Sequence, residues 1–219
     1  MSDKGYRVLI PDCIIRNEDG INVSPKEFLL YYYLKILYDR QKNVKIKLNH
    51  NKFMGKFMIK SNVTFKKMVN GLYNSGLIMN RIETLPKHEM IEIELNEEVM
   101  QKKPFTMIHV NLYYLVDKIE CEGLRLMYYY ESRVNRNKQL CSQFCFAGVR
   151  LIIKETKVNK NKLKKINENL VKLKLLKMEK HELKHDGEYN EFDQEINVKY
   201  NNHYFPQTHV IKNWKFGND

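Results

Sequence analysis

The chain has 219 residues, of which 43% are hydrophobic and 11% aromatic, so it can fill a core and is not an intrinsically disordered protein. Its 38 Lys and Arg against 26 Asp and Glu give a formal net charge of +12, which favours nucleic acid or an anionic membrane surface as partner. No apolar run approaches the roughly 18 residues of a membrane span. No apolar signal core opens the chain, and four cysteines are too few for a disulfide scaffold, so we expect a cytoplasmic protein with no membrane partner.

The first expected elements are a strand and a long helix. Residues 6–10 form a short apolar run typical of a strand. Ser24 then provides a helix N-cap, Pro25 occupies the first helical position and Glu27 the third, which is the pattern of a capping box. We expect this helix to continue to about Arg40.

A strand, two helices and a hairpin follow. Apolar residues alternate with lysines over residues 44–48, which predicts a brief strand, and residues 49–58 predict a short helix. Ser61 caps a third helix, and Gly76 ends it. The two hairpin strands are predicted at residues 77–85 and 89–95.

A similar pattern recurs about 98 residues later. Residues 31–33, three tyrosines, match residues 128–130, and residues 65–68 (Phe-Lys-Lys-Met) match residues 163–166 (Leu-Lys-Lys-Ile). Two features that repeat in order at nearly one offset predict a duplicated unit. The second copy is predicted to contain a strand at 106–110, a helix at 122–137, a strand at 145–146, a helix at 148–156, a helix at 159–173, and wing strands at 175–183 and 195–200.

The positive charge is concentrated at matching places in this repeat. Residues 49–70 carry five lysines and no acid, and residues 154–180 carry ten lysines against three glutamates. Together these segments account for the whole net charge. A charge run is commonly a solvated helix face, but two runs at equivalent places favour two contact surfaces.

Residues 60–78 strongly resemble the recognition helix and first wing strand of winged helix-turn-helix proteins, in which a glycine closes the helix and two apolar residues begin the wing. The resemblance implies an α+β fold of two tandem winged helix-turn-helix domains, each with three helices and a β-hairpin wing. The expected domains are residues 1–98 and 99–201, with residues 202–219 as a tail that packs on the body. The second copy departs from the pattern because Lys174 stands where the glycine is expected.

In this superfamily the third helix enters the major groove of duplex DNA, where asparagine can read adenine and lysine can reach guanine or phosphate. Lysines elsewhere, including those at the wing tips, would hold phosphates. The residues expected to contact DNA are Lys60, Ser61, Asn62, Thr64, Lys66, Lys67 and Lys87 in the first copy, and Lys157, Asn159, Lys160, Asn161, Lys162, Lys164, Lys165 and Lys184 in the second.

Two winged helices in a chain of this length are similar to the replication initiator proteins of plasmids and phages. That resemblance implies binding to repeated, AT-rich origin sites, a homodimer, and contact with a host replication helicase or its loader. Two alternatives stay open: a transcriptional regulator, such as a repressor, that binds an inverted operator, and a protein-interaction scaffold of tandem winged helices.

The residue patterns of enzymes and metal sites are incomplete. Residues 71–76 have the glycine spacing of a phosphate-binding loop but lack the following Lys-Ser/Thr. Cys141, Cys145, His181 and His185 have the wrong setting for zinc, because the cysteines precede a core strand and the histidines lie on a wing. We therefore expect no enzyme, no cofactor and no metal. The two tyrosine triplets are expected in the core and a dimer face rather than stacked on unpaired bases.

Overall fold

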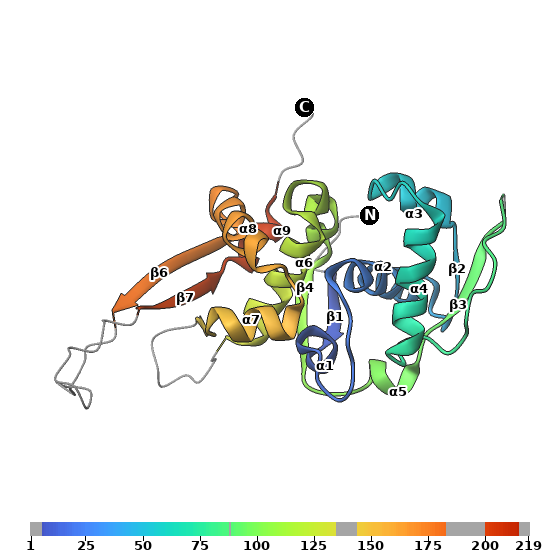
Figure 1. The fold of residues 1–219 in the computed structure, drawn as a ribbon, viewed down its shortest axis with the longest axis horizontal. Coiled ribbons are helices and arrows are strands. Elements are labelled where there is room, and N and C mark those ends of the chain that lie inside the picture. Colours follow the sequence, from blue (N-terminus) through green and yellow to red (C-terminus); the bar gives the residue numbers. More distant parts are fainter. Residues whose placement is uncertain (1–5, 88, 135–143, 183–199, 215–219) are drawn as a thin grey trace.

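The computed structural model describes residues 6–87, 89–134, 144–182 and 200–214. The predicted mixed α+β class is confirmed, since nine α-helices accompany three small antiparallel sheets within these ranges. In Figure 1 the sheets lie at the two ends and near the middle of the molecule, with helices packed between them. No helix in the described ranges is both long and apolar enough to cross a lipid bilayer.

A two-stranded ribbon near the middle joins the two halves of the chain. Strand β1 (Arg7–Pro11) pairs antiparallel with β4 (Phe105–His109), which starts and ends 98 residues later. One face of the ribbon buries Val8 and Ile108, whereas the other exposes the opposed residues Leu9 and Met107. The ribbon therefore places the start of one copy directly against the start of the other.

We call the elements from α2 (Pro25–Gln41) to β3 (Ile91–Glu94) the first unit; they follow the predicted order except for the first strand of the hairpin. Glu27 N–H donates to the Ser24 hydroxyl, and the Glu27 carboxylate accepts the Ser24 N–H, so the predicted capping box is confirmed. The unit consists of α2 (Pro25–Gln41), β2 (Lys45–Leu48), α3 (His50–Lys56), α4 (Asn62–Asn74) and β3 (Ile91–Glu94).

The second unit follows the same order after the ribbon. It consists of α6 (Val116–Ser132), β5 (Cys145–Phe146), α7 (Val149–Thr156), α8 (Lys160–Lys172), β6 (Leu176–Glu182) and β7 (Tyr200–Pro206). Four short helices lie outside the two units, and the sequence did not predict them: α1 (Asp12–Arg16), α5 (Glu97–Met100), the 3₁₀ helix η1 (Val110–Leu115) and α9 (Thr208–Lys212).

The two units share a strand order. In the second unit β7 lies between β5 and β6. In the first unit β3 pairs with β2 on one side, and on the other side Leu95 forms an isolated bridge with Ile78. In each unit, therefore, the last strand (β3 or β7) lies between two neighbours. One is the first strand of the unit (β2 or β5), and the other is the segment that follows α4 or α8.

Helices α2 and α6 supply the centre of the core. The tyrosines at 31, 32, 128, 129 and 130 are fully buried. The Tyr128 ring packs edge-on against Phe28 and Tyr32, with centroid distances of 5.6 and 5.7 Å, and its hydroxyl donates to the Val8 carbonyl at 3.0 Å. The predicted core position of these rings is confirmed, and burial closes them to unpaired bases.

The predicted hairpin of the first unit is wrong in one strand. Residues 77–85 form only the bridge at Ile78 instead of a strand. The side-chain amide of Asn80 explains the break, because it donates to the Glu92 carbonyl at 2.9 Å and accepts the Glu94 N–H at 2.8 Å. The Asn80 side chain thus occupies the Glu92 carbonyl and the Glu94 N–H, which a continued strand would pair with its backbone.

Two element boundaries in the second unit also differ from prediction. Helix α6 (Val116–Ser132) is broken at Glu120, so its part after the break begins close to the predicted residue 122. It ends earlier than predicted, at Ser132, where the Arg16 guanidinium donates to the Ser132 carbonyl. The last strand was predicted at residues 195–200; the structure describes it at Tyr200–Pro206, and residues 195–199 lie outside the described ranges. Part of the expected tail therefore belongs to the sheet, where the buried Tyr204 ring stacks on Tyr130 at 4.4 Å.

Candidate nucleic-acid interface

Helix α4 presents one apolar face to the core and one polar face to solvent. The Ser61 hydroxyl accepts the Val63 N–H at 3.2 Å and so begins the helix as predicted. The inward face buries Phe65, Met68 and Leu72. The opposite face therefore stays open along the first turns of the helix, where the predicted DNA contacts lie.

Helix α8 repeats this construction 98 residues later and has the same length of 13 residues. The Asn159 side-chain oxygen accepts the Asn161 N–H at 2.8 Å, and Leu163, Ile166 and Leu170 are buried. That oxygen therefore caps the helix, and the NH₂ group of Asn159 has no part in the cap.

The predicted DNA contacts fall mainly on open surface. Ser61, Thr64 and Lys66 are half-buried, and Lys184 lies outside the described residues. The side chains that are exposed are Lys60, Asn62, Lys67, Lys87, Lys157, Asn159, Lys160, Asn161, Lys162, Lys164 and Lys165.

The starts of α4 and α8 face one groove of about 340 Å³. Ser61 and Thr64 line it from α4, and Lys162 lines it from α8. Glu120 and Glu122, at the break in α6, also line the groove, and we call residues 120–122 the acidic turn. The Lys162 ammonium lies 2.8 Å from a Glu122 carboxylate oxygen and 3.3 Å from a Glu120 carboxylate oxygen. Lys162 is therefore exposed but already paired.

The pairing shifts the titration of both groups. The hydrogen bond with Glu122 raises the pKa of Lys162 above its ordinary value. Burial by itself raises the pKa of Glu122, but the hydrogen bonds from Lys162 and from the Cys121 thiol outweigh burial and leave the pKa below its usual range. Both groups are thus held in their charged forms.

A second hollow, of about 550 Å³, separates α8 from the β6–β7 hairpin. Its lining includes the apolar side chains of Leu163, Met178 and Tyr204, and its charged residues are Lys160, Lys164, Lys180 and Glu168. A net positive charge around a concave surface attracts a polyanion. The hollow therefore extends the basic surface of α8 toward the wing.

Three residues near α4 were missed by the sequence reasoning. Val63, in the first turn of α4, and Met58, four residues before the helix, are apolar yet 65% and 73% exposed. The Lys56 ammonium lies 3.5 Å from the centroid of the Tyr113 ring, and burial lowers the pKa of Lys56. Met58 and Val63 lie within three residues of Ser61 in the sequence, and this closeness was a signal for both. The position of Lys56 has no such signal, because its contact with Tyr113 joins residues 57 apart in the sequence.

The structure places some residues of the phosphate-loop and zinc patterns that the sequence analysis rejected. Gly71 is inside α4, and Cys145 is buried, where burial raises its thiol pKa to about 12. Cys141 and His185 lie outside the described residues, as does the side chain of His181. No group of three or more His, Cys, Asp and Glu side chains in the described part of the chain could hold a metal ion.

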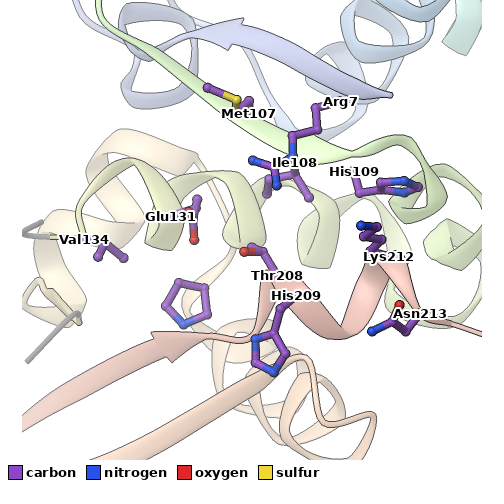
Figure 2. A pocket seen from close by; sticks show the side chains of 11 residues that line it. Arg7, Met107, Ile108, His109, Glu131, Val134, Thr208, His209, Lys212 and Asn213 are labelled. Carbon is purple, nitrogen blue, oxygen red and sulfur yellow. The ribbon is translucent and has the colours of Figure 1, made fainter. Parts of the chain in front are cut away.

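A separate cavity of about 730 Å³ lies between the β1–β4 ribbon and α9 (Figure 2). Its lining includes Arg7, His109 and Lys212, none of which was predicted as a site residue.

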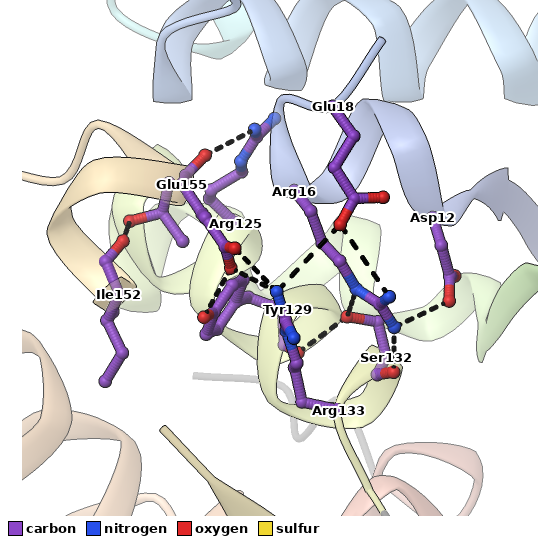
Figure 3. A network of polar contacts seen from close by, with 10 residues as sticks. Asp12, Arg16, Glu18, Arg125, Tyr129, Ser132, Arg133, Ile152 and Glu155 are labelled. Carbon is purple, nitrogen blue, oxygen red and sulfur yellow. Dashed lines mark hydrogen bonds and ion pairs between the residues drawn. The ribbon is translucent and has the colours of Figure 1, made fainter. Parts of the chain in front are cut away.

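A polar network holds α1, α6 and α7 together (Figure 3). Arg16 pairs with Asp12 at 2.8 Å and also contacts Ser132. Arg133 at the end of α6 pairs with Glu155 of α7 at 2.6 Å. The network fixes α7, which precedes α8 in the chain, against the residues that follow β1.

Neither a protein-family model nor a curated protein sequence matches the chain.

Proposed function

We propose that the chain is a sequence-specific duplex-DNA-binding protein built from two tandem winged helices, and that it acts as a plasmid or phage replication initiator at repeated, AT-rich origin sites. The observation that carries the proposal is the equivalence of α4 and α8. Each has 13 residues, begins at a side-chain cap and exposes lysine and asparagine on its first turns. The residues after each helix pair next to the last strand of the unit, as the bridge at Ile78 in the first and as β6 in the second.

The chemistry of the two helices supports duplex DNA as the ligand. Asn62 and Asn161 stand exposed on the first turns of the helices, with lysines one turn later. Side chains at these positions of a recognition helix meet base edges, and lysines near them neutralise phosphates. We propose that the protein carries no catalysis of its own, acts as a homodimer, and recruits a host helicase or its loader.

Binding to duplex DNA across a salt series tests the proposal. We expect Lys164→Gln combined with Lys165→Gln to weaken binding at least about tenfold and to reduce the slope of log affinity against log salt by about 2, because two phosphate contacts are lost. The matched control is Lys45→Gln with Lys47→Gln, two exposed lysines of β2 with the same loss of charge. Equal affinity in both variants would overturn the assignment of α8.

Footprinting on the DNA beside the gene separates the possible roles. Several protected direct repeats support an initiator. One protected palindrome over a promoter would make the protein a repressor, because a two-fold dimer reads inverted half-sites. No protection above random duplex would leave a protein-interaction scaffold.

A further inference from the structure

We infer that the cavity between the β1–β4 ribbon and α9 is a binding site for a small organic phosphate of nucleotide size. The cavity measures about 730 Å³, within the range of roughly 300–1,000 Å³ that small-molecule sites occupy. It is separate from the surfaces of α4 and α8, since none of the predicted DNA contacts in the described residues lines it.

The floor of the cavity comes from two paired strands. Arg7 of β1 and His109 of β4 are direct partners across the antiparallel ladder, so their side chains emerge side by side on one face of the ribbon. The His109 Nδ1 atom accepts the Asn111 N–H at 3.2 Å. This bond fixes the orientation of the ring on the face of the ribbon that also carries Arg7.

The opposite wall is α9, and it is fixed in place. The Asn111 side-chain amide donates to the carbonyls of Ile211 and Lys212 at 3.3 and 3.4 Å, and the Ile211 side chain is fully buried. The Gln207 N–H, just before α9, donates to the Leu175 carbonyl at 2.8 Å. Lys212 therefore faces the ribbon from an anchored backbone.

The charge of the cavity points to an anion. Figure 2 shows Lys212 and Thr208 on α9 facing the strand that carries His109. Among the described residues that line the cavity, Glu131 is the single carboxylate. Within the described residues no hydrogen bond or ion pair engages the side chain of Arg7 or Lys212, unlike Arg16 and Arg133, which are both paired.

Two cations that face one cavity repel each other until an anion lies between them. A phosphate group meets this need best, because guanidinium and ammonium groups bind its oxygens by charge-assisted hydrogen bonds. The remaining volume, with the hydroxyl of Thr208 and the amide of Asn213, suits the polar body of a nucleoside.

Titration calorimetry of the full chain with ATP, in buffer without divalent cations, tests the site. We expect binding by ATP, no detectable binding by adenosine, and at least about tenfold weaker ATP binding by the Arg7→Gln, Lys212→Gln double variant. The Lys45→Gln, Lys47→Gln variant controls for the loss of two positive charges, and it should bind ATP as the wild type does.

The duplex-DNA affinity of the same variants separates this inference from the proposed function. An unchanged DNA affinity in the Arg7→Gln, Lys212→Gln variant, together with lost ATP binding, supports a distinct anion site, and ATP binding by a protein that binds no DNA would also support it. Absence of ATP binding, or equal ATP affinity in both double variants, overturns the inference. So does a parallel loss of DNA and ATP binding, which would make the cavity part of the DNA surface.

Discussion

Gly76 and Lys174 stand 98 residues apart and adopt the same left-handed backbone conformation, with φ of 67° and 57°. Each ends its helix with the same bonds: the N–H of the left-handed residue donates three residues back, and the next N–H donates to Leu72 or Leu170 at 2.9 Å. The repeat thus extends to a backbone detail that the sequence disguises, because a lysine occupies the glycine position of the second unit.

Lys174→Gly should stabilise the protein by about 0.5–1 kcal/mol, because glycine adopts the left-handed conformation without the penalty of a β-carbon. Urea unfolding measures the change in the free energy of unfolding. Lys172→Gly is the matched control, because Lys172 is exposed within the last turn of α8, where glycine should destabilise the helix by about 1 kcal/mol. Destabilisation by both substitutions would contradict the equivalence of Lys174 with Gly76.

The parts of the fold that the sequence predicted are those whose signals are local. Ser61 and Asn159 precede their helices directly, and Gly76 follows α4 directly, so α4 and α8 were predicted closely. The prediction of a strand at residues 77–85 was wrong because Asn80 has the sequence context of a strand residue. In the structure its side-chain amide makes the hydrogen bonds to β3 that the strand backbone would make.

The candidate site was predicted by residue type but not by pairing. The exposed lysines of α8 follow from the helical spacing of its buried residues. Lys162, however, meets Glu120 and Glu122, which lie about 40 residues earlier, and only the fold brings them together. The cavity lined by Arg7 and Lys212 has no sequence signal for the same reason, because its walls come from segments far apart in the chain.

Glu155→Ala should destabilise the protein by about 2 kcal/mol. The side chains of Arg133 and Glu155 are 27% and 14% exposed, and the Tyr129 hydroxyl also donates to Glu155 at 2.7 Å. Removal of the carboxylate therefore leaves the half-buried Arg133 guanidinium and the Tyr129 hydroxyl without this acceptor. Urea unfolding measures the loss. Glu168→Ala, which removes an exposed partner of Lys164 at 3.9 Å, should cost less than about 0.5 kcal/mol. Similar effects from the two substitutions would show that the network of Figure 3 adds nothing to stability.

The ion pair of Glu122 should make stability depend on pH in the acidic range. Its pKa is lowered in the folded protein, so its contribution is present above the unfolded value of about 4.3 and is lost as the pH falls through the lower folded value. Glu122→Gln should therefore destabilise the protein at pH 7, and the difference from wild type should shrink between about pH 5 and pH 3. Unfolding curves across this range measure the difference. Glu89→Gln, at an exposed position, should match wild type throughout, and a Glu122→Gln deficit that stayed constant with pH would argue against the ion pair as its cause.

Under the proposed function, Glu120 and Glu122 should restrain DNA binding, because Lys162 does not reach a phosphate while it is paired with them. Glu120→Gln combined with Glu122→Gln should tighten duplex binding about threefold or more at low salt and steepen the salt dependence by about 0.9, the value of one added phosphate contact. Fluorescence anisotropy with labelled duplex measures both quantities.

Two further variants identify Lys162 as the source of that gain. Glu97→Gln with Glu98→Gln makes the same change of net charge on α5, away from the groove, and should raise affinity less. Adding Lys162→Gln to the Glu120→Gln, Glu122→Gln variant should remove the extra affinity and the extra salt dependence. If the triple variant kept them, the released charge would act through the general field of the protein, and Lys162 would not be the residue that the acidic turn withholds from DNA.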